Sequence, residues 1–524
     1  MQTGRILRTV RHLRLRQLAY QVWYRIYRPR YVRTALPRGT VTGSGATVAP
    51  IPKPRSWDGL AFCFLNVRAE TADWNDSSRG MLWCYNLNYM DWLGQEGLSL
   101  QEGLRWIDRF IDALPHNRIG QDPYPTALRV LNWIKFFDHW KQHPATAAAD
   151  AAQYDRLTAL YSQVRLLERR LEFHLLGNHL LEDLYALYVA AVYFQDARLY
   201  RKAGRLLRKE LDEEVLPDGA HYEQSPMYHC ILLDRLLDCI NYSALAPGLP
   251  QQEATLQFLS RKATRMLGHL QAMVYADGSL PLSNDSALGI APTTQEIFDY
   301  ARRLGLTWEA AAPGECGYRK AANRQMEAVL DIGQIAATYQ AGHTHADTFH
   351  YELRTDGRPF IVDTGISTYD KTPRRQYERS TAAHNTVVVQ GRDSSEVWGG
   401  FRVGSRCRVH IEQDTPGQWQ ARHTGTARQA WHRRRFTLTE TAFTVDDETS
   451  PHLPAISYIH LAPGVTIRHT DGHTFTTSAG TIAVEGADNI EQLSTQVAQT
   501  YNRLEPNITL ALHYRGHLSY SITC

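Results

Sequence analysis

The sequence predicts two folded parts, a closed or partly closed α/α toroid followed by an antiparallel β-sandwich. Apolar residues recur at three-to-four spacing between about 80 and 310, and short Val-, Ile-, Thr- and aromatic-rich runs separated by turn residues follow 330. The chain has 524 residues, 43% hydrophobic and 21% charged, which is enough for more than one sizeable core. Disordered, collagen-like and coiled-coil classes are therefore excluded.

Residues 1–57 are predicted to form a basic amphipathic arm and linker. They contain 12 Lys and Arg but no Asp or Glu, so the rest of the chain has 45 basic against 54 acidic residues, a net charge of −9. Apolar residues at spacings of three to five predict a helix with a basic face that ends near Pro29. This helix docks either on its own protein or on a membrane surface or partner. Residues 35–56 are predicted to be an extended linker.

The overall composition also limits partners and location. A net-acidic body argues against nucleic acid as a partner, because counterion release needs a broad basic footprint. The seven cysteines include no CxxC pair, which argues against a disulfide framework or a thiolate zinc site and favours a reducing compartment. No stretch approaches the roughly 20 apolar residues of a membrane span, and arginines interrupt the N-terminus where a secretory signal needs an apolar core. We therefore expect a cytoplasmic location, with the arm offering membrane association.

Residues 58–315 are predicted to be an array of helical hairpins. No sequence period of 20 to 50 residues is visible, which argues against a strict solenoid and favours a toroid. Residues 316–524 are predicted to be the β-sandwich, since helical periodicity is almost absent after 330. The predicted helices cover 104–114, 128–140, 157–173, 180–194, 227–245 and 256–275, and the predicted strands include 349–353, 360–362, 386–389, 436–438, 456–461 and 508–514.

Two polar clusters are predicted near the starts of helices. Asn178 and His179 stand between leucine pairs, where they either cap a helix or carry chemistry. The turn at 217–229 is dense in ionisable and aromatic groups and places Tyr228 in the first turn of a helix. The helix dipole there favours an anion and helps a tyrosine to deprotonate. A buried tyrosine with a hydrogen-bonded hydroxyl is the structural alternative.

A third cluster combines histidines and carboxylates in the β part. The alternation in 342–347 puts His343 and His345 on one face of a strand. With Asp363 and His384 downstream, His345 completes an imidazole, carboxylate and imidazole set of the kind that binds Zn²⁺. Hydrogen bonding between strands is the alternative use of these groups.

Five motifs follow one another in order between about 80 and 350. They are WCYNLNYMDW at 83–92, DPYPTALRVLNW at 122–133, GNHLLE at 177–182, QSPMYH at 224–229 and GHTHAD at 342–347. This ordered set resembles the heparinase II/III family of polysaccharide lyases, on both predicted domains. The resemblance implies an incomplete α/α toroid followed by an antiparallel β-sandwich, and cleavage of an acidic, uronate-containing polysaccharide by β-elimination.

The resemblance also implies roles for individual residues. Asn178, aided by His179, would neutralise the uronate carboxylate through a neutral donor. Tyr228 and His343 would serve as acid and base, since a phenol suits an alkoxide-like leaving group and neutral histidine takes a proton near pH 7. Whether Tyr228 performs both steps depends on whether the proton and the leaving oxygen lie on the same sugar face, which differs between uronate epimers. The family's zinc is structural and would map to His345, Asp363 and His384. No organic cofactor is expected.

Substrate contacts are expected from both domains. Tyr124 is predicted to be an aromatic platform, and Gln224 and His229 are polar residues of the turn at 217–229. Arg129 and Arg379 are the predicted arginine contacts. Core packing of the aromatic residue and solvation of the arginines are the alternatives. Asn178, where some relatives have Glu, agrees with the heparinase III and alginate-lyase branches.

The basic arm is similar to that of relatives associated with bacterial surface-polysaccharide production. The acidic body favours a modestly charged uronate polymer over heparin, because long-range attraction for a densely sulfated chain is missing. The 12 basic residues of the arm are accordingly assigned to location or docking rather than to catalysis.

Two other functions remain open. A glycoside hydrolase would need two facing carboxyls, for which candidates are Glu182, Asp183, Asp218, Glu223 and Asp277. A degenerate lyase could instead bind nascent polysaccharide or a synthesis complex without turnover.

Overall fold

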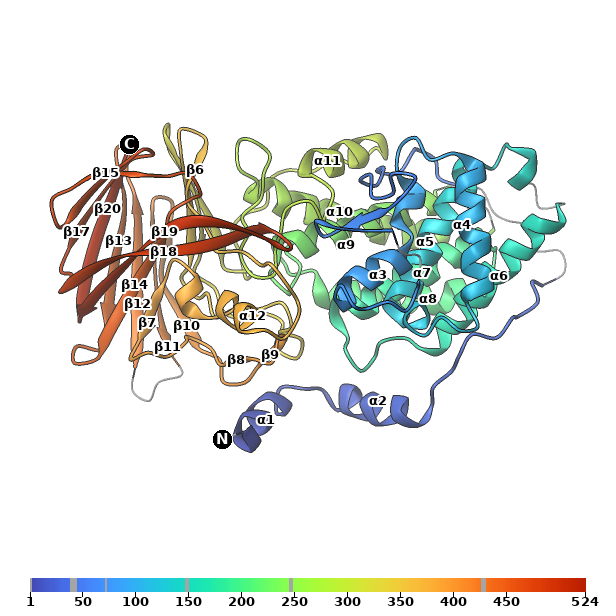
Figure 1. The fold of residues 1–524 in the computed structure, drawn as a ribbon, viewed down its shortest axis with the longest axis horizontal. Helices are drawn as coiled ribbons and strands as arrows, with labels where there is room; N and C mark the ends of the chain where they lie inside the picture. Colours follow the sequence, from blue (N-terminus) through green and yellow to red (C-terminus); the bar gives the residue numbers. More distant parts are fainter. Residues whose placement is uncertain (1, 38–44, 71–72, 147–149, 245–247, 426–429) are drawn as a thin grey trace.

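The computed structural model describes residues 2–37, 45–70, 73–146, 150–244, 248–425 and 430–524. A helical part and a β part lie side by side along the long axis, and the N-terminal arm runs past both (Figure 1). The predicted class of helices followed by antiparallel sheets is confirmed. Among the described residues, no helix is both long and apolar enough to cross a lipid bilayer.

The helical part is organised around α7 (Gly177–Tyr193), which is apolar on every side and buried along nearly its whole length. It packs against α5 (Pro123–His139), α8 (Ala197–Glu214) and α9 (Pro226–Ser243). Side-chain caps start several of the helices, as Asp196 does for α8 by accepting from Leu199 N. The other long helices are α3 (Met81–Tyr89), α4 (Leu100–Ala113), α6 (Ala151–Arg169), α10 (Gln252–Met273) and α11 (Thr294–Arg303).

All six predicted helices are present, although the predicted ends of several run past the observed ones. Three further helices of the helical part, α3, α8 and α11, and the hairpin of β1 (Phe62–Phe64) and β2 (Val67–Ala69) lie outside the six predicted ranges. The charged sequence of α8 obscures an apolar stripe at helical spacing, whose buried members include Leu199, Ala203, Leu207 and Leu211.

The β part consists of antiparallel sheets with side chains alternating between core and solvent, as in β13 (Phe443–Thr449). An eight-stranded sheet has the order β10-β11-β12-β13-β20-β17-β16-β15, and two four-stranded sheets have the orders β18-β19-β14-β7 and β3-β4-β5-β6. The strands are β3 (Tyr318–Ala322), β4 (Met326–Asp331), β5 (Tyr351–Thr355), β6 (Arg358–Ile361), β7 (Val387–Val389), β10 (Arg408–Thr415), β11 (Gln418–Thr424), β12 (Trp431–Leu438), β14 (Pro454–His460), β15 (Ile467–Thr470), β16 (Thr474–Thr477), β17 (Thr481–Glu485), β18 (Asn489–Thr500), β19 (Arg503–Arg515) and β20 (His517–Thr523).

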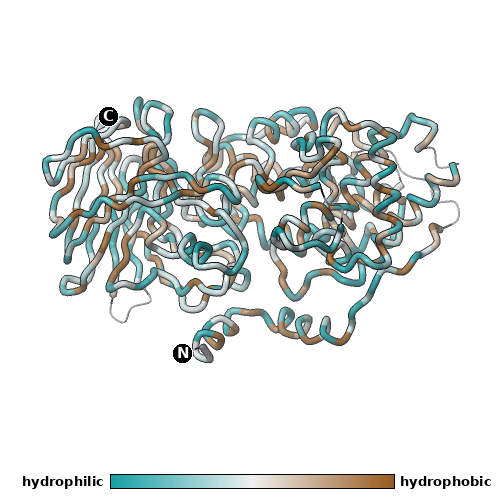
Figure 2. The backbone as a smooth tube through the Cα atoms, in the orientation of Figure 1, coloured by the Kyte–Doolittle hydropathy of each residue, from teal (hydrophilic) through white to brown (hydrophobic). Residues whose placement is uncertain are grey.

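The arm contains two helices, where one was predicted. These are α1 (Gln2–Val10) and α2 (Leu15–Ile26), separated by a break at 11–14. Both mix apolar and hydrophilic residues along their length (Figure 2). The arm docks on its own protein, which is the first of the two interpretations of its sequence. Residues 38–44 of the predicted linker lie outside the described residues.

Candidate active site

Asn178 is positioned by an unusual start of α7. Leu176 and Gly177 have φ values of 62° and 60°, in the left-handed region that disfavours side chains. A Cβ on Gly177 would lie 2.4 Å from Glu223 Oε1 and 2.8 Å from Gln340 Cγ. The chain turns sharply here because glycine leaves room for the Glu223 carboxylate, and Asn178 emerges in the first helical turn.

Glu223 fixes the Asn178 amide from two directions. Its Oε1 accepts from Asn178 N at 2.9 Å, and both of its oxygens accept from Asn178 Nδ2 at 3.0 to 3.1 Å. Asn178 Nδ2 also lies 3.2 Å from His343 Nε2. The amide therefore uses its two N–H groups on the carboxylate and on the imidazole.

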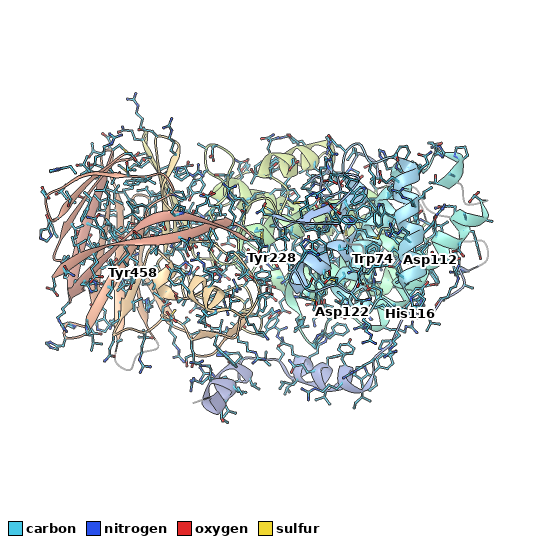
Figure 3. All side chains as sticks on the ribbon, viewed as in Figure 1. Trp74, Asp112, His116, Asp122, Tyr228 and Tyr458 are labelled. Carbon is cyan, nitrogen blue, oxygen red and sulfur yellow. The ribbon has the colours of Figure 1, made fainter. Side chains whose placement is uncertain are left out.

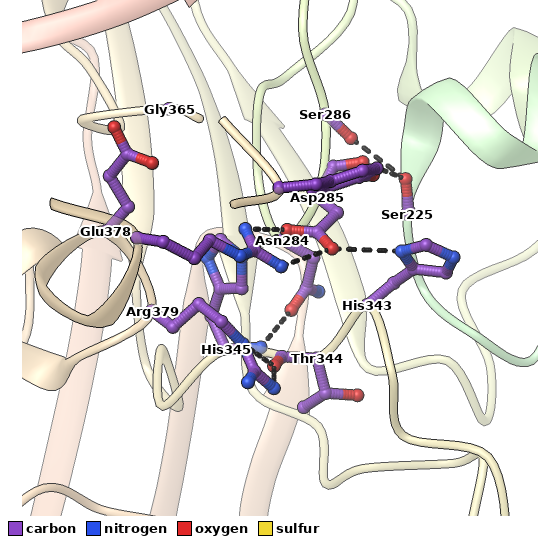
Figure 4. A network of polar contacts seen from close by, with 12 residues as sticks. Ser225, Asn284, Asp285, Ser286, His343, Thr344, His345, Gly365, Glu378 and Arg379 are labelled. Carbon is purple, nitrogen blue, oxygen red and sulfur yellow. Dashed lines mark hydrogen bonds and ion pairs between the residues drawn. The ribbon is translucent and has the colours of Figure 1, made fainter. Parts of the chain in front are cut away.

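Asp285 lies at the centre of the network that holds His343 (Figure 4). Its Oδ2 is 2.9 Å from His343 Nδ1, and its Oδ1 is 2.8 Å from His345 Nε2. Arg375 donates to both oxygens, at 2.5 and 2.7 Å. Burial opposes the charge on Asp285, but the Arg375 guanidinium and the two imidazoles hold the pKa of Asp285 well below its usual range.

These contacts fix where the proton of His343 sits. The Asp285 carboxylate only accepts, so His343 Nδ1 carries the hydrogen. The Asn178 amide nitrogen only donates, so His343 Nε2 presents a lone pair. His343 thus carries its hydrogen on Nδ1, which a carboxylate holds, and presents the Nε2 lone pair to the Asn178 amide, the arrangement of a general base once that amide is displaced.

Tyr228 lies directly against His343 at the junction of the helical and β parts (Figure 3). Ser225 caps α9 by accepting from Tyr228 N, which puts the tyrosine in the first helical turn. The rings of Tyr228 and His343 stack with centroids 3.9 Å apart, and Tyr228 Oη is 3.3 Å from Tyr369 Oη. Burial raises the pKa of Tyr228 above its usual value, so the phenol keeps its proton at neutral pH.

His179 occupies the next position of α7. Its Nδ1 is 3.1 Å from Glu172 Oε2, and its ring centroid is 4.9 Å from that of Tyr124. Burial lowers the pKa of His179, but the Glu172 carboxylate outweighs it and the net shift is upward. The imidazole is therefore cationic over a wider pH range than a free histidine.

Two cavities meet at these residues. One has a volume of about 780 Å³ and is lined by Asn178, His179, Tyr228 and His343. The other, of about 730 Å³, extends into the helical part and is lined by Arg235. The aromatic residues Tyr89, Tyr124, Tyr228 and Tyr369 line both. An extended polymer can therefore pass through both cavities with Tyr228 between them.

The structure brings Tyr124 into this site, but four other predicted substrate contacts are structural instead. Arg129 is fully buried and donates to the carbonyls of Asn88 and Gly120. Gln224 donates to Cys316 O and His229 contacts Met266 O, both in the core. Arg379 donates to Thr344 O. Each of the four lies outside both cavities and satisfies buried backbone carbonyls, which a short motif does not reveal.

The predicted metal set also changes by one histidine. His345 Nε2 bonds Asp285, whereas His350 joins Asp363 and His384 in a fully buried group that could hold a metal ion. Asp363 Oδ2 lies 2.7 Å from His384 Nδ1 and 3.2 Å from His350 Nε2. The Nε2 atoms of both histidines are buried without a hydrogen-bond partner among the described residues. This donor set fits a metal ion that prefers nitrogen and oxygen ligands.

Four residues of the site were not predicted to hold its catalytic side chains, namely Glu223, Asp285, Tyr369 and Arg375. The sequence suggested the Asp285 turn only as a lining of the cleft and Arg375 only as a contact of substrate carboxylates. Glu223 had been considered only as a hydrolase carboxyl, and its bonds to Asn178 show that it orients the amide instead. Asp285 stands in an ordinary Ser-Asn-Asp-Ser turn and Arg375 in an arginine run. The Asp285 turn, rich in buried polar residues, was the available signal.

Fold and site together define a polysaccharide lyase, with a helical domain, an antiparallel β domain and an amide, a phenol and an imidazole at their junction. Family models agree: residues 89–302 match "Heparinase II/III N-terminus" and residues 306–523 match "Heparinase II/III-like, C-terminal". The chain belongs to the heparinase II/III family. A search of curated protein sequences found no match to the chain.

Solved structures share this fold. A heparinase III gene product is 14% identical with a TM-score of 0.63, covering 86% of this chain and 80% of its own. A second heparinase III structure is 15% identical with a TM-score of 0.64, covering 84% and 76%. A mutant of the heparan sulfate lyase HepC from Pedobacter heparinus is 16% identical with a TM-score of 0.59, covering 90% and 81%.

Proposed function

We propose that the protein cleaves a uronate-containing polysaccharide by β-elimination, with Asn178, Tyr228 and His343 acting on one sugar. The convergence of these three side chains in one cavity carries the proposal. Removal of the C5 proton of a uronate puts negative charge on its carboxylate, so the site must supply a donor for the carboxylate, a base for C5 and an acid for the departing oxygen. The Asn178 amide supplies the donor, the His343 imidazole supplies the base and the Tyr228 phenol supplies the acid.

Binding of the carboxylate prepares the base. The Asn178 N–H that points at His343 Nε2 turns to a carboxylate oxygen, and His179, whose pKa the Glu172 carboxylate raises, binds the other. This exchange frees the His343 lone pair to take the C5 proton. Glu223 keeps the amide oriented throughout, and Asp285 stabilises the imidazolium that forms.

The stacking of Tyr228 on His343 puts acid and base on the same face of the sugar, because their ring centroids are only 3.9 Å apart. This arrangement suits a uronate whose C5 hydrogen and C4 oxygen are cis, as in glucuronate and mannuronate. Uronates with the inverted C5, such as guluronate, present these groups on opposite faces. We therefore assign the substrate to the glucuronate or mannuronate configuration.

Poly-mannuronate and poly-guluronate blocks of alginate, together with a glucuronate polymer, test this assignment. The expected result is ultraviolet absorbance from the C4–C5 unsaturated uronate, with faster cleavage of poly-mannuronate than of poly-guluronate. Faster cleavage of poly-guluronate would overturn the same-face assignment. New reducing ends without absorbance would indicate hydrolysis, and binding without either signal would indicate a non-catalytic polysaccharide-binding protein.

Tyr228→Phe tests the acid. We expect kcat to fall by about 10²-fold or more, because the phenylalanine cannot protonate the leaving oxygen, while affinity for the polymer changes little. Tyr154→Phe, an exposed tyrosine of α6, is the matched control. Unchanged turnover of Tyr228→Phe would remove this residue from the scheme.

A structural Zn²⁺ is proposed at His350, Asp363 and His384. The observations that support it are His384 Nε2, which is buried without a hydrogen-bond partner among the described residues, and the buried Asp363 carboxylate that lies close to both imidazoles. Bound there, the ion would tie the β5 start to the segment before β7 beneath the site, and it would take no part in the elimination. Elemental analysis of protein purified without added zinc should find roughly one zinc per chain, lost in His350→Ala. Zinc-free, fully folded protein would refute the assignment.

We also propose a location for the protein at the cytoplasmic face of a membrane, where bacterial surface polysaccharide is made. The side chains of Leu7, Leu15 and Ile26 are 66%, 84% and 77% exposed on a segment without acidic residues, which favours contact with anionic lipid. Co-sedimentation with phosphatidylglycerol vesicles is expected, and Leu15→Glu with Ile26→Glu should abolish it. Equal binding to neutral phosphatidylcholine vesicles would contradict the proposed attraction between the basic arm and anionic lipid.

A further inference from the structure

The N-terminal arm spans the junction between the two parts of the protein. In Figure 1, α1 lies near β8 (Val397–Trp398), β9 (Arg402–Val403) and α12 (Pro373–Glu378), and α2 lies beside the helical part. The arm therefore crosses the region where the catalytic side chains gather, and its contacts on each side can be followed separately.

On the β part, α1 is held by charge and by an indole. Arg8 donates to both carboxylate oxygens of Glu396, at 2.7 and 2.8 Å. Arg5 Nε donates to the same carboxylate at 3.2 Å, and Trp398 Nε1 donates to Thr9 Oγ1 at 3.0 Å. Bidentate binding of this kind fixes the orientation of the helix as well as its position.

Beside the helical part, α2 is held by hydrogen bonds to backbone carbonyls and by contacts of Arg16 with Glu210 and the Phe173 ring. Gln17, which is 2% exposed, donates to Leu175 O at 3.0 Å and to Tyr339 O at 3.3 Å. Tyr24 Oη donates to Leu171 O at 2.5 Å. Leu175 directly precedes the turn that presents Asn178, so α2 is attached to the same segment that builds the site.

The arm forms one wall of the catalytic cavity. The cavity of about 780 Å³ that is lined by Asn178, His179, Tyr228 and His343 is closed on another side by arm residues Ile6, Thr9, Val10, His12, Leu13 and Gln17. Its volume falls within the usual size of a ligand site. Without the arm, this cavity would be an open groove, so the arm belongs to the architecture of the site.

Basic side chains gather where the arm meets the β part. Arg406 lines the cavity with a buried Nε that has no hydrogen-bond partner among the described residues. Burial and the nearby charge of Arg11 lower the pKa of Arg406 to about 10, yet the side chain remains cationic at neutral pH. No carboxylate forms an ion pair with Arg406 in the described part of the chain, and its Nη1 makes a long hydrogen bond of 3.5 Å to Ala337 O, so its charge is available to a ligand.

We propose that the arm completes the substrate cleft and that Arg406, with His12 of the arm beside it, binds an acid group on a sugar next to the one that is cleaved. The inference rests on the lyase function proposed above and adds a recognition element to it. It makes the substrate a polymer with an acidic group on a neighbouring sugar as well as on the cleaved uronate. It also gives the arm a role in recognition that its sequence did not indicate.

Calorimetry with a mannuronate tetrasaccharide tests the subsite in the full-length Tyr228→Phe protein, which should bind without turnover. Adding Arg406→Gln should raise Kd about tenfold, and adding His12→Ala about threefold, because a charge-assisted bond and a contact are lost. Arg408→Gln removes an exposed arginine outside the cavity and is the matched control. Thermal melting of each variant checks that the fold is kept.

The same substitutions in the active protein give the second readout. KM should rise by a similar factor while kcat stays within twofold. Equal tetrasaccharide affinity for Arg406→Gln and its parent, or a loss confined to kcat, would overturn the subsite. Absence of unsaturated product from the wild-type protein would overturn the lyase function instead, and the calorimetry would still decide whether Arg406 binds acidic sugars.

Discussion

Asp285 connects more of the active site than any residue that the motifs highlight. It accepts from His343 and from both nitrogens of the Arg375 fork, and it is fully buried. The carboxylate sets the tautomer of His343, and the guanidinium keeps that carboxylate ionised. Catalytic competence therefore depends on a charge that does not touch the sugar, which makes Asp285 a positioning residue.

Asp285→Asn should lower kcat about 10²- to 10³-fold. An asparagine amide can donate as well as accept, so it no longer requires His343 Nδ1 to carry the hydrogen, and the imidazole loses its fixed tautomer. The substitution should also destabilise the protein by about 3 to 5 kcal/mol, since Arg375 is left buried without a counter-charge. The absorbance assay and thermal melting measure the two effects. Arg375→Met in the same chain separates them.

The double variant Asp285→Asn/Arg375→Met removes the buried charge and should recover stability without recovering turnover. Asp277→Asn, a carboxylate with 48% of its side chain exposed and paired with Arg354, is the control and should leave kcat unchanged. Full activity of Asp285→Asn would show that His343 needs no partner.

The side chains proposed to be catalytic could be named from the sequence because each stands in a compact motif that carries the family resemblance, at a helix start or in a histidine run. Their partners could not. Asp285 precedes His343 by 58 residues and Arg375 follows Asp285 by 90, so only the fold brings them together. The prediction that Arg129 contacts the substrate failed for the same reason. Arg129 belongs to a motif, but in the fold it bonds backbone carbonyls of the core.

The start of α7 shows how a helix end can set the geometry of a site. Leu176 and Gly177 both take positive φ, and the space where a Gly177 side chain would lie holds the Glu223 carboxylate. The predicted helix at 180–194 matches the body of α7, yet periodicity says nothing about this turn. Helix bodies could be predicted from apolar spacing, whereas their irregular starts, where the chemistry lies, depend on tertiary contacts.

Gly177→Ala should destabilise the protein by roughly 1 to 3 kcal/mol, because alanine is strained at this φ and its Cβ displaces Glu223. Turnover should fall as well, since Asn178 loses its fixed orientation. Gly204→Ala on α8 is the matched control: its Cβ meets Tyr188 at 3.7 Å, an ordinary contact, and it should stabilise by about 0.5 to 1 kcal/mol. Chemical denaturation of both variants gives the comparison, and equal shifts in one direction would contradict this account.

The ion pairs that attach α1 to the β part all use the Glu396 carboxylate. Hydrogen bonds from Arg8 lower the pKa of Glu396 to about 2, so this pair is complete at neutral pH. Because the pKa of Glu396 is lower when docked than its free value of about 4.3, the stabilisation is present above that value and is lost as the pH falls toward 2. Docking of α1 should therefore be insensitive to pH between about 5 and 8.

Glu396→Gln should release α1 and expose its arginines to trypsin. We expect cleavage within 5–16 to become several-fold faster at neutral pH, and to match the unaltered protein at a pH where Glu396 is protonated. Glu485→Gln, an exposed glutamate of β17, should change nothing. The measurement is the rate of loss of the intact chain under limited proteolysis at pH 7, with an acid-active protease at low pH. A cleavage rate unaffected by Glu396→Gln would show that other contacts hold the helix.

The position of the arm determines where the positive charge of the molecule lies. The sequence separates a segment with 12 basic residues from a body of net −9, and we assigned the first to location or docking rather than to catalysis. The structure places that basic segment beside the catalytic cavity, so positive potential lies where an anionic polymer enters. In this proposal the arm supplies the long-range attraction that the body lacks, in addition to its docking on the protein.

Activity on a uronate polymer should therefore fall as salt rises. Between about 20 and 200 mM NaCl the Debye length shortens from roughly 20 to 7 Å, which screens attraction between arm and polymer. We expect kcat/KM to drop several-fold, almost entirely through KM, because bound-state chemistry is shielded from the solvent.

Replacing the exposed Arg25, Arg28 and Arg30 by Gln leaves both anchors of the arm intact and should weaken the salt dependence of kcat/KM. The same number of exposed arginines replaced on the β part, at Arg435, Arg468 and Arg515, should not. If both triple variants kept the salt dependence of kcat/KM that the unaltered protein shows, the arm would line the cleft without attracting the polymer electrostatically.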